Sequence, residues 1–204
     1  MDLYSLATDV LEDVIVHAVH CLRGGGVIVC PTETVYGLMT LWSNRNGRDH
    51  IYEMKGRDRD KPLQMLAHDL DAAVAAGVKR SDRLERLFGA FCPGPLTIVC
   101  SGQQQGTIGV RFPDHPFVQR LLRELGQPLA ATSANVSGKP ATRDAWEAFQ
   151  TLHEPPDMLI DGGDVGEPKA STVVSIIDAV PRILRPGPIT QKDIDDALGQ
   201  GTLF

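Results

Sequence analysis

The sequence lacks the cysteine spacing of a zinc site or a redox dithiol. No CxxC pair occurs, and neighbouring cysteines are at least eight residues apart in the set Cys21, Cys30, Cys92 and Cys100. Reduced thiols of an intracellular protein are therefore expected. The N-terminal stretch MDLYSLATDVLEDV is acidic and does not resemble a signal peptide, and no apolar run is long enough to cross a membrane. We expect a cytoplasmic protein that does not contact membranes.

The sequence also lacks an excess of basic residues. Its 20 Lys and Arg residues are outnumbered by 26 Asp and Glu residues, giving a net charge of −6, which argues against a surface that grips nucleic acid throughout. A local basic pocket remains compatible with this charge. There is no GxxxxGK[ST] loop, and RGGGV lacks the GxGxxG spacing. GxSxG, HExxH and kinase motifs are missing too. Any nucleotide must be held by scattered cations and hydroxyl groups.

What the chain contains is an alternation of helical and strand-like segments. Its 204 residues, 42% of them hydrophobic, suit a single domain spanning 1–204. Asp9 and Glu12 have the spacing of a capping box, and the helix that they open should end at Gly24–Gly26. Further helices are expected at 46–55, 81–91, 116–125, 143–152 and 190–198. Strands are expected at 27–30, 63–67, 95–101, 108–113, 128–134, 158–163, 171–177 and 181–187. Because several strands follow one another directly, we expect an α/β fold with a twisted mixed sheet flanked by helices.

The segment CPTETVYGL (30–38) crowds polar groups against the end of an apolar strand. A simple turn would use Gly, Asn or Asp there. Thr32, Glu33, Thr34 and Tyr36 instead suit the carboxyl end of a strand, where open α/β sheets bind ligands.

The segment KGRDRDK (55–61) gathers four cations within seven residues. Lys55 and Arg57 flank Gly56 at an expected helix end, where cations can converge on phosphate. For Arg59, a solvated loop is the favoured interpretation.

Three further segments have both a functional and a plain structural interpretation. Arg111 in the apolar stretch IGVRF is a ligand contact or the partner of a structural salt bridge, with equal weight. ATSANVSGKP offers the polar groups of Ser133 and Asn135, although an Asx-rich turn explains this pattern too. Arg185 in RILRPG is a ligand contact or a lone surface arginine.

Seven segments in order resemble the YrdC/TsaC family of L-threonylcarbamoyladenylate synthases: PTETVYGL, KGRxxxKPL, PGPLTIV, GVRFPDHP, TSANVSGKP, DGG…STVVSI and ILRPG. The resemblance runs from about residue 8 to about residue 190. It implies a YrdC-like fold with a concave binding surface, in the short form without an extra C-terminal domain. It also implies a nucleotidyltransferase that converts L-threonine, bicarbonate and ATP into L-threonylcarbamoyladenylate and pyrophosphate.

The resemblance further implies partners. A threonylcarbamoyl transferase complex would use the product to modify the tRNA adenosine next to the anticodon, and direct contact with tRNA is possible. Mg²⁺ would accompany the ATP phosphates, so no dedicated metal motif is expected.

Site residues follow from the resemblance block by block. The implied catalytic set is Lys55, Arg57, Ser133 and Asn135. The implied L-threonine contacts are Thr32 or Thr34, between which the sequence does not choose, with Arg111, Ser133 and Ser171. The implied ATP contacts are Lys55, Arg57, Lys61, Thr107, Asn135, Arg143 and Arg185.

Two positions depart from the family pattern. Met39 follows YGL where a glycine is common, and ATR (141–143) replaces a serine-proline element, so we expect changes at the pocket rim. The main alternative function is a double-stranded RNA or tRNA-binding module of the same fold without synthase activity. A carbamoyl-transferring domain of hydrogenase maturation proteins is a second rival, but its acylphosphatase and zinc-finger-like segments are absent. An inactive paralogue is a third, opposed by the intact catalytic set.

Overall fold

The computed structural model describes residues 1–139, 142–166 and 170–199. The strands in these residues form one sheet with the order β1-β8-β2-β3-β7-β4-β6-β5-β9-β10. Their bounds are β1 Asp2–Ser5, β2 Ile28–Cys30, β3 Gly37–Leu41, β4 Gln64–Leu66, β5 Leu96–Ser101, β6 Thr107–Arg111, β7 Leu129–Ser133, β8 Met158–Asp161, β9 Thr172–Ser175 and β10 Arg182–Arg185. Four neighbouring pairs are parallel (β1/β8, β2/β8, β4/β6 and β5/β9) and the others are antiparallel. The expected mixed α/β sheet is confirmed.

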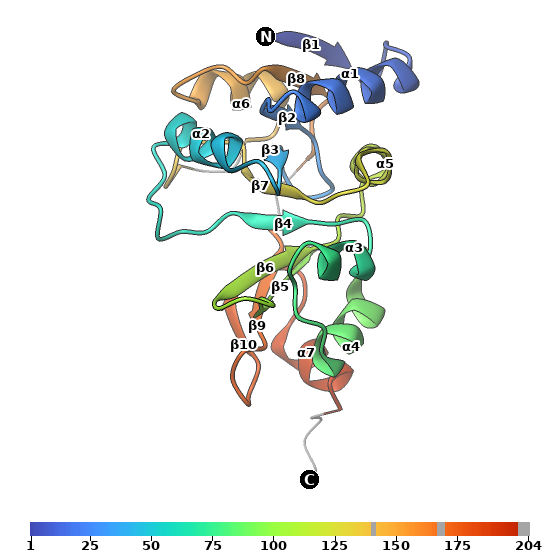
Figure 1. Cartoon of the computed structure of the whole chain (residues 1–204), viewed down its shortest axis with the longest axis vertical. Helices are drawn as coiled ribbons and strands as arrows, with labels where there is room; N and C mark the ends of the chain where they lie inside the picture. Colours follow the sequence, from blue (N-terminus) through green and yellow to red (C-terminus); the bar gives the residue numbers. More distant parts are fainter. Residues whose placement is uncertain (140–141, 167–169, 200–204) are drawn as a thin grey trace.

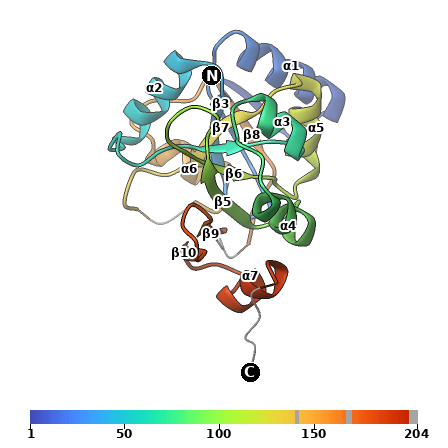
Figure 2. The same ribbon diagram turned by 60° about the horizontal axis from the view of Figure 1, so that its bottom comes forward.

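Helices cover both faces of this sheet (Figure 1). Their bounds are α1 Leu11–Arg23, α2 Arg45–Lys55, α3 Leu70–Ala75, α4 Asp82–Phe91, α5 Pro116–Leu125, α6 Ala145–Thr151 and α7 Gln191–Ala197. Ile28 packs with the apolar side chains of α1 and α5, whereas Val29 packs with those of α2 and α6. Since successive side chains of a strand point to opposite faces, the two helix pairs cover opposite sides of the sheet. Figure 2 shows the β9–β10 hairpin and α7 at the end of the molecule away from α1 and α2.

The start of α1 differs from the sequence prediction. Val10 is the N-cap residue and makes no side-chain capping bond. The Asp9 carboxylate instead accepts a hydrogen bond from the backbone N–H of Ser5 at 2.7 Å. The predicted capping box is wrong because Asp9 stabilises the turn before the helix. The predicted end of the helix at Gly24 is confirmed.

The end of α2 determines the positions of Lys55 and Arg57. The Asn44 side chain caps the start of α2 by accepting from the N–H of Gly47 at 3.1 Å. The helix stops at Gly56, whose φ of 55° is in the left-handed region that favours glycine. The chain therefore turns sharply between Lys55, which is buried, and Arg57, which is partly exposed.

The lower half of the sheet contains β4, β5, β6 and β9 (Figure 1). Side chains of these strands point alternately to a core face and to the opposite face. Side chains of β4, β5, β6 and β9 that pack under α3, α4 and α7 include Met65, Leu96, Ile98, Cys100, Val110 and Val174. The residues between them point to the opposite face of the sheet. They include Gln64, Thr97, Val99, Gly109, Arg111 and Val173.

The structure adds three elements that the sequence reading did not predict, namely β1, β3 and α3. It also corrects the expectation for Met39, which lies on β3 fully buried in the core beside α1 and α5 and not at a pocket rim. Of the ATR departure, Ala141 lies outside the described residues, as does Pro140. No helix in the described ranges is long and apolar enough to cross a membrane.

Candidate functional site

A cavity of about 450 Å³ lies on the sheet face opposite α3, α4 and α7. Its volume is in the range typical of small-ligand pockets. The lining comes from β4, β5, β6, β7, β9 and β10 and from the loops around them. Eight residues expected from the sequence are brought together there: Thr34, Arg57, Thr107, Arg111, Ser133, Asn135, Ser171 and Arg185.

Two expected ATP contacts lie away from this cavity. Lys61 is exposed, and its ammonium group pairs with Asp58 at 2.8 Å. Arg143 is also exposed, and its Nε donates to the carbonyl of Gly166 at 3.1 Å. The structure therefore gives neither side chain a place in the cavity wall.

The loop between β2 and β3 separates the roles of its two threonines. The Thr32 hydroxyl donates to the carbonyl of Val35 at 2.7 Å and accepts from the N–H groups of Thr34 and Val35, both at 3.2 Å. Thr32 therefore stabilises the turn itself. Thr34 lines the cavity, with its hydroxyl 3.0 Å from that of Thr32. Thr34 is the better candidate for a ligand contact.

Tyr36 joins this loop to a distant segment of the chain. Its hydroxyl donates to the carbonyl of Gly163 at 2.7 Å and accepts from the N–H of Gly162 at 3.0 Å. The ring is fully buried. The tyrosine of PTETVYGL and the glycines of DGG thus meet for a structural reason.

Lys55 lies behind the cavity wall, with an exposed fraction of 1%. Its ammonium nitrogen donates to the carbonyl oxygens of Ser133 and Asn135. Burial, together with the nearby charge of Arg57, lowers the pKa of Lys55 to about 7. A neutral amine has two N–H groups and keeps both bonds. Protonation adds a third N–H and a positive charge next to the cavity wall.

Arg57 and Arg59 lie in different environments. Arg57 lines the cavity, and its guanidinium is held by the carbonyls of Lys61 at 2.9 Å and Pro62 at 3.2 Å. Arg59 is exposed and forms an ion pair with Asp49. Two backbone acceptors fix Arg57 without neutralising its charge, so it remains available to an anionic ligand.

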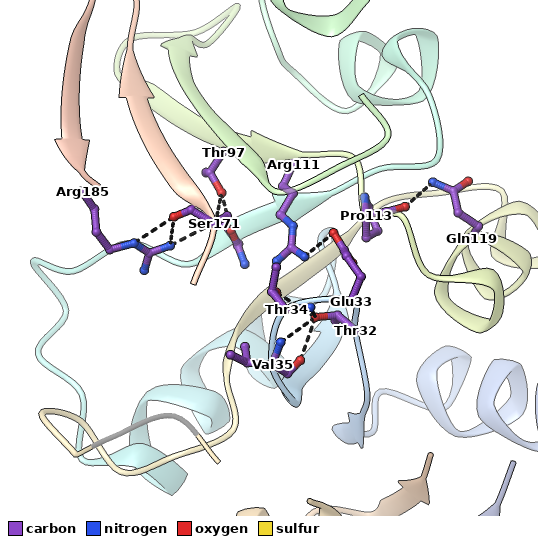
Figure 3. A network of polar contacts seen from close by, with 11 residues as sticks. Thr32, Glu33, Thr34, Val35, Thr97, Arg111, Pro113, Gln119, Ser171 and Arg185 are labelled. Carbon is purple, nitrogen blue, oxygen red and sulfur yellow. Dashed lines mark hydrogen bonds and ion pairs between the residues drawn. The ribbon is translucent and has the colours of Figure 1, made fainter. Parts of the chain in front are cut away.

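Arg111 forms the structural salt bridge that the sequence offered as one interpretation and is also placed where a ligand could reach it. It forms an ion pair with Glu33 at 2.6 Å, and it also lines the cavity (Figure 3). Its Nε atom is buried and has no hydrogen-bond partner in the protein. A salt bridge and a ligand contact are therefore compatible at this residue.

A chain of hydrogen bonds forms the opposite part of the wall (Figure 3). Arg185 donates to the hydroxyl of Ser171 at 3.0 Å and to its carbonyl at 2.8 Å. The hydroxyls of Ser171 and Thr97 are 2.9 Å apart, and Thr97 donates to Gln64 Oε1 at 3.0 Å. Sequence reasoning missed Thr97 and Gln64. The available signal was a polar residue on the non-core face of an apolar strand.

The cavity is basic although the chain is acidic. Its charged lining in the described residues is cationic and consists of Arg57, Arg111, Lys139 and Arg185. Within the same residues the lining holds no Asp, Glu, His or Cys. Asn135 adds a buried Oδ1 acceptor with no partner in the protein, while its amide group donates to the carbonyls of Val136 and Lys139. An unpartnered buried acceptor at this place is open to a hydrogen bond from water or a ligand.

Fold and cavity together define a class: an α/β protein whose mixed sheet carries a basic, hydroxyl-lined pocket with the charge and volume that suit small anions. The Sua5_yciO_yrdC family model, described as "Telomere recombination", matches residues 20–187. The chain belongs to this Sua5/YciO/YrdC family, as its sequence motifs predicted.

Individual relatives agree with this assignment. The threonylcarbamoyl-AMP synthase of Bacillus subtilis is 36% identical over 195 residues, which cover 91% of this chain and 56% of the relative. The crystal structure of Pyrococcus abyssi Sua5 complexed with L-threonine has a TM-score of 0.86 at 30% identity, covering 97% of this chain and 60% of that one. Escherichia coli YciO has a TM-score of 0.82 at 26% identity, with 95% and 98% covered. The chain thus spans little more than half of the first two relatives.

Proposed function

We propose that this protein is an L-threonylcarbamoyladenylate synthase, a nucleotidyltransferase acting on L-threonine, bicarbonate and ATP. The observation that carries the proposal is the convergence of three arginines with Thr34, Ser171 and Asn135 on one cavity. The similarity to a Bacillus subtilis threonylcarbamoyl-AMP synthase and to a Sua5 structure holding L-threonine supports the same reaction.

L-Threonine is assigned to the part of the cavity between Arg111, Thr34 and Ser171 (Figure 3). A guanidinium with an unpartnered Nε suits the amino-acid carboxylate, because planar forks bind carboxylates well. The two hydroxyls suit the polar groups of the same substrate. Ser133, which also lines the cavity, is assigned to both substrates.

ATP is assigned to the part of the cavity that contains Arg57, Arg185, Thr107 and Asn135. The cations offset the negative charge of the triphosphate, and Lys55 behind the wall adds its charge when it is protonated. Lys139 was not expected from the sequence, and its place in the lining makes it a further candidate for the phosphates.

The chemistry that this arrangement serves needs positioning and charge neutralisation. The amine nitrogen of L-threonine bonds to the bicarbonate carbon with loss of water and forms a carbamate. A carbamate oxygen then attacks the α-phosphorus of ATP, and pyrophosphate leaves with the electrons of the broken bond. No covalent enzyme intermediate is required, and the cations stabilise the charge that develops around phosphorus.

Mg²⁺ would enter with ATP in this proposal. Since the described lining contributes no carboxylate, the ion would be held through phosphate oxygens and water. Downstream, the adenylate would pass to a threonylcarbamoyl transferase that modifies tRNA.

The test is to measure pyrophosphate release with ATP, bicarbonate and L-threonine, leaving out each in turn. We expect release to require both L-threonine and bicarbonate. Equal release without them would mean simple ATP hydrolysis to AMP and pyrophosphate. RNA retention without any pyrophosphate release would favour the RNA-binding alternative.

A further inference from the structure

Glu33 is the charged group of the β2–β3 loop to which the proposed reaction gives no role. Its Oε1 accepts from Nη2 of Arg111 at 2.6 Å. The two residues are 78 positions apart, and Arg111 is the last residue of β6. The side chains of Arg111 and Glu33 are 3% and 19% exposed, so this is a largely buried ion pair.

A buried guanidinium needs such a partner. Arg is always charged, and its long side chain has many rotamers to lose when it is fixed in one direction. Backbone acceptors hold the cavity cations Arg57 and Arg185, whereas a carboxylate holds Arg111. The carboxylate therefore both compensates the burial of Arg111 and fixes its direction.

The geometry places Glu33 behind Arg111. Arg111 lines the cavity and Glu33 does not. Figure 3 shows Ser171 and Arg185 on one side of the Arg111 guanidinium and Glu33 on the other. Glu33 Oε2 and Arg111 Nε are both buried without a hydrogen-bond partner in the protein, so the pair keeps a buried acceptor and a buried donor that its single bond does not use.

We propose that Glu33 is the positioning residue of Arg111, which it aims at the carboxylate of the amino-acid substrate. This inference rests on the proposed function and deepens its threonine end. Glu33 acts through Arg111 and does not touch substrate. Its loss should impair L-threonine binding while leaving ATP binding, which uses other cations, nearly unchanged.

The experiment measures the dissociation constants of L-threonine and ATP by calorimetry for wild type and Glu33→Gln. Gln keeps the size and an acceptor but removes the charge. We expect L-threonine binding to weaken about tenfold or more, because a charge-assisted bond is about twice as strong as a neutral one. The ATP constant should stay within about twofold. Glu33→Asp, which keeps the charge, should lose less than Glu33→Gln.

A double-mutant cycle tests whether Glu33 affects L-threonine binding through Arg111. In an Arg111→Lys background, Glu33→Gln should change L-threonine affinity by less than about twofold, because the aimed group is already gone. Glu124→Gln removes the carboxylate of an exposed ion pair with Arg120 and serves as the control, with both affinities unchanged.

Three results would overturn the inference. They are unchanged L-threonine affinity in Glu33→Gln, equal losses for L-threonine and ATP, and the full Glu33→Gln loss persisting in the Arg111→Lys background. If Glu33→Gln fails to fold, Glu33→Asp decides: it must weaken L-threonine more than ATP, or the inference is wrong. A wild-type protein that binds no L-threonine would overturn the proposed function as well, whereas the three results above leave that function standing.

Discussion

At the scale of single residues, neighbouring side chains of the same type have separate tasks. Thr32 satisfies three backbone groups of its own turn, while Thr34 lines the cavity. Arg57 lines the cavity, while Arg59 pairs with Asp49 in solvent. Each pair therefore offers a matched comparison between a structural and a ligand-binding role.

The two threonines should respond oppositely to alanine. Thr34→Ala should raise the dissociation constant for L-threonine about three- to tenfold with little loss of stability, since one neutral hydrogen bond is removed. Thr32→Ala should lower the free energy of unfolding by about 1–3 kcal/mol, because it leaves buried backbone groups unpaired. Urea unfolding and calorimetry distinguish the two effects. The reverse pattern would show that Thr32 is the ligand contact.

Arg57→Ala should weaken ATP binding by about one to two orders of magnitude. A charge-assisted hydrogen bond contributes about 1.5–3 kcal/mol, and about 1.4 kcal/mol corresponds to tenfold. Arg59→Ala should leave ATP affinity unchanged, because an exposed ion pair contributes little. ATP titration of both folded variants checks this. An ATP affinity in Arg57→Ala equal to that of wild type would remove Arg57 from the nucleotide site.

Lys55 predicts a pH dependence of ATP binding. Its pKa is lowered to about 7 without ligand, and polyphosphate favours the charged form and so raises that pKa. Below pH 7 the group is already protonated, whereas above pH 7 binding must take up a proton. ATP affinity should therefore fall as pH rises from 7 to 9, by at most about tenfold per unit. In Lys55→Met the fall should disappear. An identical slope in that variant would assign the pH dependence to another group.

At the scale of elements, the start of β9 and the turn after β10 are hydrogen-bonded to each other and closely packed. The Thr172 hydroxyl donates to the carbonyl of Ile189 and accepts from its N–H, both at 2.9 Å. A Cβ added at Gly187 would lie 2.7 Å from Thr172 Oγ1 and 2.8 Å from the Ala170 carbonyl. Gly187 is therefore required for this close approach.

Gly187→Ala should lower the free energy of unfolding by about 1–3 kcal/mol through overpacking. It should also weaken L-threonine and ATP binding together, because Ser171 lies directly before β9 and Arg185 is the last residue of β10. Gly89→Ala on α4 is the control: its Cβ would meet nothing within 4 Å. That change should stabilise the protein by up to about 1 kcal/mol. Chemical unfolding with ligand titration would contradict the account if both variants behaved alike.

Elements with clear periodicity or strong end signals could be predicted from the sequence, such as α5 with Pro116 at its start and Gly126 after its end. β3 was missed because all five of its residues are buried, so no alternation marks it. β1 has four residues and α3 has six, too few for a period to show.

The site residues could be predicted from sequence motifs. The residues that hydrogen-bond to them, such as Thr97 and Glu33, could be identified only in the fold. Thr97 and Ser171 are 74 positions apart, and Glu33 and Arg111 are 78 apart. A polar residue in a strand does not reveal which strand becomes its neighbour. Sheet order, with β5 between β6 and β9, decides that. Nor does a motif show which way the side chains of its loop turn, so the sequence did not show that Lys61 and Arg143 lie outside the cavity.

At the scale of the whole molecule, a chain with a net charge of −6 surrounds a cavity whose described charged lining is cationic. An acidic exterior repels polyanions in general, while a basic cleft with low-dielectric walls focuses the field on small anions that enter it. This contrast suits an enzyme for ATP and an amino acid better than a protein that coats nucleic acid.

The central claim is that this one cavity joins three small substrates into an adenylate. Incubation with L-threonine, ATP and ¹³C-bicarbonate, followed by mass spectrometry of the nucleotides, tests it most directly. The account predicts L-threonylcarbamoyladenylate that carries the label in its carbamoyl carbon and disappears when L-threonine is omitted. Consumption of ATP with AMP and pyrophosphate as products, and no labelled adenylate in the presence of all three substrates, would contradict it.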